Sequence, residues 1–194
     1  LCNKPGTHLL LDIGTNGEMV LAKDGVLSAC STAAGPAFEG AGIAYGMCAG
    51  AGAITKVAYD ERRGFSLHVV ENMVPVGISG SGVIDALACM LRKGVMDETG
   101  YIPEKYLIPA QGSTQRGYPL YQDSSGKENH ILLTREDIRQ IQMAKAAIYA
   151  GAMSLLEKEG VSLNELDTIY LAGAFGSHID VVNAMQIGLL PRIN

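Results

Sequence analysis

The chain has 194 residues, of which 47% are apolar and 18% are charged, and its formal net charge is −5. These values are typical of a folded domain with a sizeable core and exclude a largely disordered chain. The 15 Lys and Arg residues are spread along the sequence, and no apolar run approaches the roughly 18 residues of a membrane span, so we expect neither nucleic-acid binding nor membrane insertion.

The four cysteines are Cys2, Cys30, Cys48 and Cys89. They form no CxxC pair, and no His-rich segment accompanies them, so the sequence does not predict an iron–sulfur or zinc site built from this chain alone. We expect reduced, mostly buried thiols in a cytoplasmic protein.

Three strands are predicted at the start of the chain. HLLLDI (8–13) and EMVLAK (18–23) would pair through a hairpin at Asn16-Gly17, because both residues tolerate the positive φ of a tight turn. Asp24-Gly25 is a second such turn and leads into VLSACST (26–32). The opening therefore reads as an antiparallel meander.

A short helix and a second hairpin should follow the meander. Pro36 suits the first position of a helix that ends near Tyr45. AITKVAYD (53–60) and RGFSLHVVE (63–71) alternate as strands do and flank a charged turn.

Residues 75–95 predict a strand, a Gly/Ser turn and a helix from about Gly82 to Lys93, with Gly94 just beyond its end. The turn GISGSG (77–82) suits either a phosphate-binding helix N-terminus or tight packing, and packing is favoured. Residues 97–130 are polar and rich in Pro and Gly, which indicates an insertion with one hairpin. The insertion is either a docking surface or a solvated loop.

The longest predicted helix begins after Thr134, where Asp137 completes a box-like cap, and it ends near Glu159 before Gly160. Its apolar positions recur with a spacing of three and four, and Lys145 falls in the gap of that inward stripe. A lysine there needs an anionic or carbonyl partner, or must extend its stem outward to water. The stripe consists of Ile138, Ile141, Ile148, Ala152 and Leu155.

The last predicted elements are the buried strand TIYLAG (168–173) and a helix capped by Ser177, with Gly188 at its end. Antiparallel strands followed by strands that alternate with helices argue for an α/β fold with a mixed sheet and flanking helices.

The Gly-rich turn after the first strand is the first candidate for ligand binding. Backbone N–H groups of Gly14, Thr15, Asn16 and Gly17 could hold a phosphate, but Asp12 would repel that anion unless a hydrated Mg²⁺ lay between them. Alternatively, Asp12 caps its own turn. The turn by itself supports both interpretations.

The segment IYLAGAFGSHID (169–180) is the second candidate. Small residues directly after a buried strand would allow a flat ligand group to lie against the backbone, and ligands of open α/β sheets bind beyond the carboxyl ends of strands. The alternative is an ordinary tight turn. The small or aromatic residues in question are Gly173, Ala174, Phe175 and Gly176.

Four motifs together resemble the ATPase domain of the reductive activators of corrinoid proteins, within the actin, sugar-kinase and heat-shock-chaperone superfamily. They are DIGTNGE, GISGSGVIDAL, REDIRQIQMAKAAI and LAGAFGSHIDVVNAMQIGLLP. The resemblance covers nearly the whole chain except 97–130. It implies an actin-like, ribonuclease-H-like lobe, the second half of a two-lobed fold, and a chain that is one part of a longer protein.

The resemblance also implies roles for particular residues. Asp12 would act on a Mg²⁺-bound or attacking water, and the Gly14–Gly17 turn would grip the phosphates of ATP. Gln142 and Lys145 would contact the nucleoside or a phosphate, and Gly173–Gly176 would form the adenosine wall, where Ala174 stands in place of the usual second glycine.

The activity implied is the reduction of a Co(II) corrinoid to Co(I), coupled to ATP, on a cytoplasmic corrinoid protein of anaerobic metabolism. Such proteins carry a [2Fe–2S] cluster in an N-terminal ferredoxin domain, and they are often dimeric. This chain has no loop of cluster-binding cysteines, so the cluster is expected only outside it. It has one D-x-G-T segment where the complete fold has two, so half of the nucleotide cleft is missing and the isolated chain is expected to be inactive. The alternatives are an activator of acyl-CoA dehydratases, a small-molecule kinase lobe, or a non-catalytic docking domain for a corrinoid protein.

Overall fold

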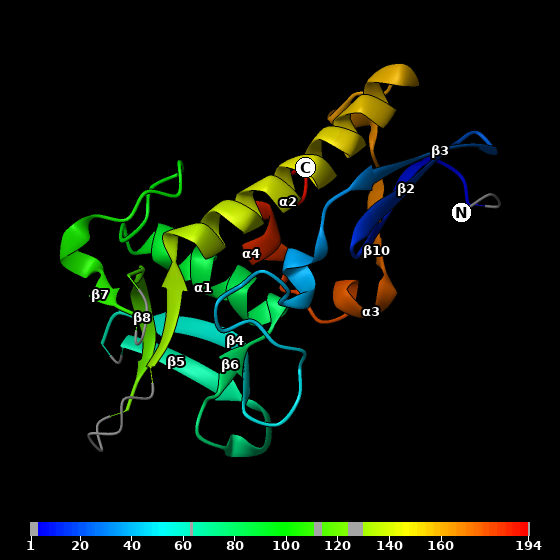
Figure 1. Ribbon diagram of the computed structural model, residues 1–194. Coiled ribbons are helices and arrows are strands. Elements are labelled where there is room, and N and C mark those ends of the chain that lie inside the picture. The colour runs from blue at the N-terminus through cyan, green and yellow to red at the C-terminus, as the bar shows by residue number, and fades with distance from the viewer. Residues whose placement is uncertain (1–3, 63, 111–113, 124–129, 194) are drawn as a thin grey trace. The chain divides into compact units, whose positions relative to one another are not determined.

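A computed structural model describes residues 4–62, 64–110, 114–123 and 130–193 (Figure 1). The chain divides into two compact units, one formed by residues 1–36 with 143–194 and the other by residues 37–142. Within the described residues, no helix combines the length and the apolar character needed to cross a membrane.

The first unit is built on a four-stranded mixed sheet with the order β10-β1-β2-β3. β1 (Thr7–Ile13) pairs antiparallel with β2 (Asn16–Lys23), β2 pairs antiparallel with β3 (Val26–Ala33), and β1 pairs parallel with β10 (Thr168–Ala172). The predicted antiparallel meander is confirmed.

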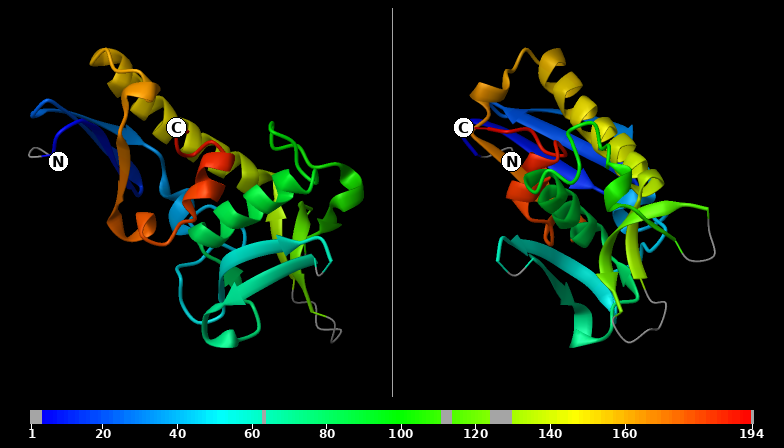
Figure 2. Two further views of the ribbon diagram at one scale, coloured as in Figure 1. Left: turned by 180° about the vertical axis from the view of Figure 1, so that it is seen from behind. Right: turned by 90° about the vertical axis from the view of Figure 1, so that its left-hand side faces the viewer.

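One face of this sheet packs against the later part of helix α2 (Arg135–Lys158), which runs along the strands in Figures 1 and 2. Because side chains alternate along a strand, every second residue of β1 and β2 faces this helix and is buried. The core between sheet and helix contains Leu9, Leu11, Ile13, Met19, Leu21, Ile148, Ala152 and Leu155.

The hairpin between β1 and β2 differs from the prediction. Ile13 pairs with Gly17, so Gly14 and Thr15 form the connection, while Asn16 and Gly17 already belong to β2. Neither Asn16 nor Gly17 has a positive φ. The Asn-Gly pair by itself favours a tight turn. Both residues also pair with β3, however, and this pairing holds their backbone extended.

The second predicted turn is confirmed, since Asp24 and Gly25 have φ values of 51° and 80°. These values are typical of the two-residue turns that match the twist of a hairpin.

After β10, the chain forms a short helix, α3 (Gly173–Gly176), and then α4 (Val181–Gln186). The predicted cap at Ser177 is wrong: the carboxylate of Asp180 caps α4 by accepting a hydrogen bond of 2.9 Å from the N–H of Asn183. The predicted end is confirmed, because Gly188 follows the helix with a φ of +76°.

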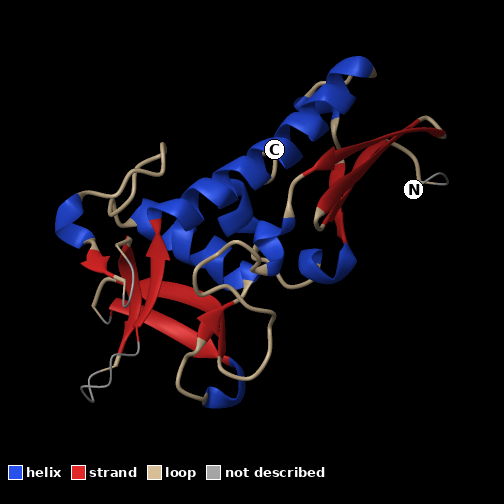
Figure 3. Ribbon diagram, in the orientation of Figure 1, coloured by secondary structure: helices blue, strands red, loops and turns tan. Residues whose placement is uncertain are grey.

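The second unit contains two small sheets. β4 (Ala53–Asp60) lies between β5 (Gly64–Val69) and the two-residue β6 (Gly77–Ile78), and β8 (Arg116–Gln122) lies between β7 (Ile108–Pro109) and β9 (His130–Thr134). The predicted β4–β5 hairpin is confirmed (Figure 3). Within residues 97–130, where one hairpin was predicted, β7 and β8 pair antiparallel, and β8 also pairs antiparallel with β9, which lies almost wholly after that segment.

Helix α1 (Gly80–Arg92) packs on β4, and its residues 80–90 are all buried. The turn before it is a packing turn, as the sequence favoured. Ser79 and Ser81 donate hydrogen bonds of 3.2 and 3.0 Å to the carbonyls of Ile54 and Thr55, and a side chain at Gly82 would collide with β4. Gly94, with a φ of +66°, follows the helix as predicted.

The helix predicted after Pro36 is shorter than expected. Only the 3₁₀ turn η1 (Pro36–Glu39) forms. Gly40 then takes a φ of +86° and packs so closely that a Cβ would lie 2.7 Å from the amide nitrogen of Met47, so the helix cannot continue.

Residues 97–110 of the predicted insertion pack into the second unit at some positions and are exposed at others, such as Asp97 and Glu98. Ile102 and Leu107 are buried, and the 3₁₀ turn η3 (Glu104–Tyr106) is tied down through Glu104. Its carboxylate lies 3.3 Å from Arg116 Nε and 2.8 Å from Arg135 Nη1. Residues 111–113 and 124–129 of the insertion lie outside the described part. Two further 3₁₀ turns, η2 (Val70–Asn72) and η4 (Leu163–Glu165), complete the elements.

The start of α2 confirms the predicted capping box. Thr134 Oγ1 accepts a bond from the N–H of Asp137, and the Asp137 carboxylate accepts one of 2.8 Å from the N–H of Thr134. The helix ends at Lys158, and Gly160 follows with a φ of +62°.

Candidate functional site

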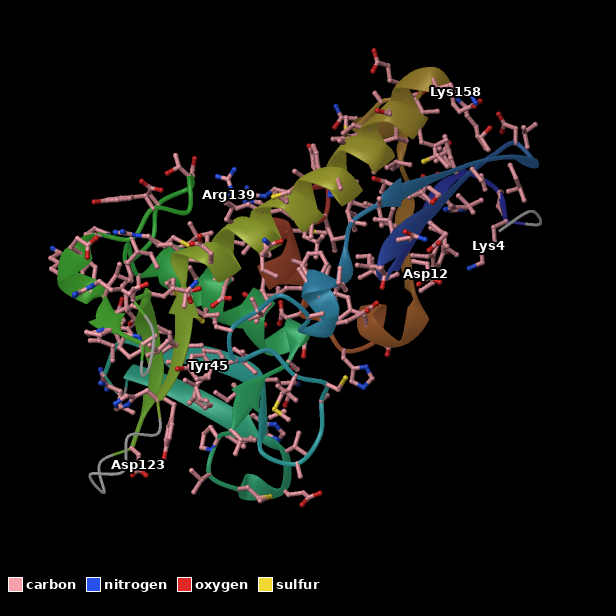
Figure 4. The ribbon with its side chains drawn as sticks, viewed as in Figure 1. Lys4, Asp12, Tyr45, Asp123, Arg139 and Lys158 are labelled. Carbon is pink, nitrogen blue, oxygen red and sulfur yellow. The ribbon has the colours of Figure 1, made fainter. Side chains whose placement is uncertain are left out.

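Asp12 lies near the end of β1, at the edge where the parallel strand β10 also ends. It stands opposite Glu18 on β2 and Ala172 on β10, and its side chain is half-buried (Figure 4). No hydrogen bond to its carboxylate is made by any residue in the described ranges. The strand register thus places the carboxylates of Asp12 and Glu18 side by side near the carboxyl end of β1.

The backbone of Gly173 lies close to that carboxylate. Its φ is +78°, and a Cβ at this position would run into Asp12 Oδ1. Only glycine combines this left-handed conformation with so close an approach. The turn after β10 and the end of β1 therefore lie next to each other. They belong to the two segments that the sequence analysis proposed for ligand binding.

The turn at Gly14–Gly17 uses part of its hydrogen-bonding capacity internally. The N–H of Gly14 donates to the carbonyl of Asn16 at 3.1 Å, and the carbonyl of Thr15 accepts from the N–H of Gly35 at 2.9 Å. Thr15 and Asn16 are exposed, whereas Gly17 is buried beneath Ile148. The role of these four amides in phosphate binding remains a prediction.

Lys145 has a carbonyl partner, which is one of the alternatives that its place in the apolar stripe left open. Its ammonium donates to the carbonyl of Ile187, the residue that ends α4, at 2.5 Å. A cation is favourable at a helix C-terminus, and partial burial lowers the pKa of the lysine. In this structure Lys145 therefore joins α2 to α4.

Gln142 belongs to the other unit and is engaged there. Its Nε2 donates to the carbonyl of Thr99 at 2.6 Å. Of the remaining predicted residues, Phe175 is half-buried and Gly176 is buried against Leu171. The side chain of Ala174 lies outside the described part of the structure.

Sequence reasoning did not single out Glu18. In the structure the turn lies at Gly14 and Thr15 and β2 begins at Asn16, so Glu18 pairs with Asp12. A turn at Asn16-Gly17 would have shifted this register and placed Glu18 elsewhere. The misplaced turn is the reason that this second carboxylate was missed.

The cysteines are less uniformly buried than expected. Cys89 is buried and Cys30 is half-buried, and burial raises the pKa of both thiols. Cys48 is exposed, which corrects the expectation of mostly buried thiols, and Cys2 lies outside the described residues. No group of three or more His, Cys, Asp or Glu residues that could hold a metal ion occurs in the described ranges.

Comparison with known proteins settles the family. Residues 6–194 match the family described as the C-terminal domain of RACo, the ASKHA domain. The chain belongs to this family. The ASKHA domain has the actin-like ATPase fold, and the expected fold class and family resemblance are thus confirmed.

Two curated relatives resemble this ASKHA domain over almost its whole length. "Corrinoid activation enzyme RamQ" of Eubacterium limosum is 38% identical over 198 residues, which cover 96% of this chain and 33% of that protein. "[Co(II) methylated amine-specific corrinoid protein] reductase" of Methanosarcina barkeri is 29% identical over 209 residues, with 97% and 35% covered.

A solved structure titled "Reductive activator for corrinoid,iron-sulfur protein" matches with a TM-score of 0.86 and 38% identity, over 98% of this chain and 31% of that one. The ASKHA domain therefore spans about a third of the length of its relatives.

Proposed function

We propose that this ASKHA domain binds Mg-ATP and serves an ATP-dependent reductive activator that returns an inactive Co(II) corrinoid to Co(I) on a corrinoid protein. Both curated relatives and the solved structure have names that refer to activation or reduction of corrinoid proteins. The reducing electron would come from an iron–sulfur cluster outside this chain. The proposal includes a cytoplasmic location and a dimeric assembly.

The observation that carries the nucleotide proposal is the contact between the Asp12 carboxylate and the Gly173 backbone. It brings together the turn after β1 and the turn after β10, which are two of the segments that the sequence assigns to phosphate and adenosine. Both segments follow the carboxyl ends of adjacent parallel strands, where α/β sheets bind ligands.

The residues at Asp12 fit a magnesium ion that is bound mainly by water and phosphate. Mg²⁺ typically takes one or two carboxylates and keeps several waters, and Asp12 offers one carboxylate without a hydrogen-bond donor from the described residues. When bound, the ion would neutralise charge on the transferring phosphoryl group. Asp12 would orient its water shell, and the exposed residues Thr15 and Asn16 would hold phosphate oxygens.

The proposal is tested by Asp12→Asn in the intact protein that contains this chain. We expect loss of ATP-driven corrinoid reduction, followed by the absorbance of the Co(II) and Co(I) forms, while thermal unfolding changes little. The reason is that the substitution keeps the size of the side chain but removes the charge that holds a hydrated cation.

Asp24→Asn is the matched control. Asp24 is exposed in the turn between β2 and β3, and asparagine tolerates its φ of 51°. This variant should keep full activity. Full activity of Asp12→Asn, with ATP dependence unchanged, would remove Asp12 from the proposed site.

A further inference from the structure

Glu18 on β2 lies directly opposite Asp12 on β1, and its side chain is exposed. Residues that oppose each other on antiparallel strands have Cβ atoms about 4.5–5.5 Å apart and point to the same face of the sheet. The register therefore brings the two carboxylates together, although six residues separate them in the sequence.

Both carboxylates point away from helix α2. Gly17 lies against Ile148 of this helix, and Met19 lies against Gly151. Because side chains alternate along a strand, Glu18, between Gly17 and Met19, faces the opposite side of the sheet.

The side chains on either side of this carboxylate pair are small. Ala172 on β10 is the register partner of Asp12 on one side, and Ser31 on β3 is the register partner of Glu18 on the other. Neither is long enough to cover the pair, so this row of the sheet has room for a hydrated ion.

The carboxylate pair lacks a compensating charge among the residues that the structure describes. In those ranges no lysine or arginine forms an ion pair with Asp12 or Glu18, and neither carboxylate accepts a hydrogen bond. Like charges directly opposite each other destabilise a sheet. Locally unfavourable choices of this kind are expected mainly where function requires them.

We infer that Glu18 is the second carboxylate of the nucleotide site and that it holds, together with Asp12, the hydrated Mg²⁺ that accompanies ATP. The inference rests on the proposed function. Proteins bind Mg²⁺ through one or two carboxylates, phosphate oxygens and several waters, so a pair of carboxylates beside the phosphate-binding turn suits this ion. The cation would also remove the repulsion between the two side chains.

This role gives Glu18 opposite effects on ATP binding with and without the metal. When Mg²⁺ is present, the carboxylate attracts the complex of metal and nucleotide. When Mg²⁺ is absent, the same negative charge repels the phosphates. A residue that only supports the fold would change binding in the same direction under both conditions.

The test is calorimetric titration of ATP into the intact protein that contains this chain, at a series of Mg²⁺ concentrations and with a chelator. Glu18→Gln should raise the Mg²⁺ concentration needed for half-maximal ATP binding about tenfold, which is typical of losing a group that orients the ligands of a metal. With the chelator, this variant should bind ATP at least as tightly as the wild type. Glu18→Asp keeps the charge and should remain closer to the wild type.

Glu157→Gln is the matched control, because Glu157 is an exposed glutamate on α2 in the same unit. It should leave the Mg²⁺ requirement unchanged, and circular dichroism should show that all three variants fold.

The titration separates failure of this inference from failure of the proposed function. A wild-type protein that bound no Mg-ATP would overturn both. If the wild type bound Mg-ATP and Glu18→Gln needed no more Mg²⁺, only the role of Glu18 would be overturned. Slower corrinoid reduction by Glu18→Gln with an unchanged Mg²⁺ requirement would also overturn it, since the carboxylate would then act on the attacking water instead.

Discussion

At the scale of single residues, the conformation of Gly173 and its closeness to Asp12 lead to a prediction about stability and nucleotide affinity. Gly173→Ala should lower both the melting temperature and the affinity for Mg-ATP, because alanine at a φ of +78° costs about 1–2 kcal/mol and its Cβ would also displace the Asp12 carboxylate. Thermal unfolding and nucleotide titration of the intact protein measure the two effects.

The matched substitution is Gly160→Ala. Gly160 has a φ of +62°, but a Cβ there would meet no atom within 4 Å. This variant should show the backbone cost alone and bind nucleotide normally. Equal losses of affinity in both variants would show that the contact between Gly173 and Asp12 is irrelevant to binding.

The residues of the site were predictable to different degrees. Asp12 and Gly173 could be identified from the local sequence. Asp12 lies near the end of an apolar run just before a Gly-rich turn, and Gly173 directly follows another such run. The inward position of Lys145 followed from helical periodicity. Its partner did not, since the carbonyl of Ile187 is 42 residues away in the chain and no periodic pattern connects the two. Gln142 likewise bonds to a carbonyl 43 residues away.

At the scale of elements, the turn at residues 97–101 predicts a pH dependence. The Asp97 carboxylate accepts hydrogen bonds from the Thr99 hydroxyl at 2.6 Å and from the N–H groups of Thr99 and Tyr101 at 2.9 and 3.0 Å. These bonds, the Thr99 hydroxyl foremost, lower the pKa of Asp97 below its ordinary value of 3.8. The carboxylate therefore stabilises the fold above that value, and the contribution is lost as the pH falls through the lowered pKa.

Asp97→Asn should accordingly reduce the melting temperature at neutral pH, and the difference from the wild type should shrink as the pH falls below about 4. Thermal unfolding across a pH series measures this. Glu98→Gln, at the exposed neighbouring position, should show no such trend. A difference for Asp97→Asn that is constant down to pH 2 would contradict the assignment.

Elements governed by local rules were predicted well. The capping box at Thr134 and the glycines that follow α1, α2 and α4 act through neighbours in sequence, so their signals are visible there. The hairpin at Asn16-Gly17 was misplaced because a strand more distant in sequence, β3, captures both residues. The cap of α4 was assigned three residues too early, since both Ser177 and Asp180 are residue types that cap helices, and Ser177 instead ends α3.

At the scale of the whole molecule, the fraction of the relatives that this chain spans leads to a prediction. The chain covers about a third of each curated relative. If the nucleotide is also contacted by the remainder of such a protein, the isolated chain should bind Mg-ATP weakly and hydrolyse it negligibly. Calorimetric titration and phosphate release measure both, with the intact protein as control. Micromolar affinity or steady turnover by the isolated chain would contradict this expectation.

The fold class was predictable from the order of elements, because an antiparallel meander followed by alternating strands and helices has few compact solutions. The division into two compact units was not, since α2 passes from one to the other without a break in its sequence pattern. The packing of residues 97–110 was also hidden. Their polar composition indicates a loop, whereas Glu104 forms ion pairs with Arg116 and Arg135, which lie further along the chain and come near it only in the tertiary structure.

The place of Asn16-Gly17 within β2 also bears on how the protein ages. An asparagine before a glycine deamidates when the glycine nitrogen can swing back onto the side-chain carbonyl and close a succinimide ring. Pairing of Asn16 with Ala33 and of Gly17 with Thr32 holds this peptide extended and keeps the two groups apart. Isoaspartate at position 16 would thus accumulate only in molecules whose hairpin has opened, and its slow appearance would record how often that opening occurs.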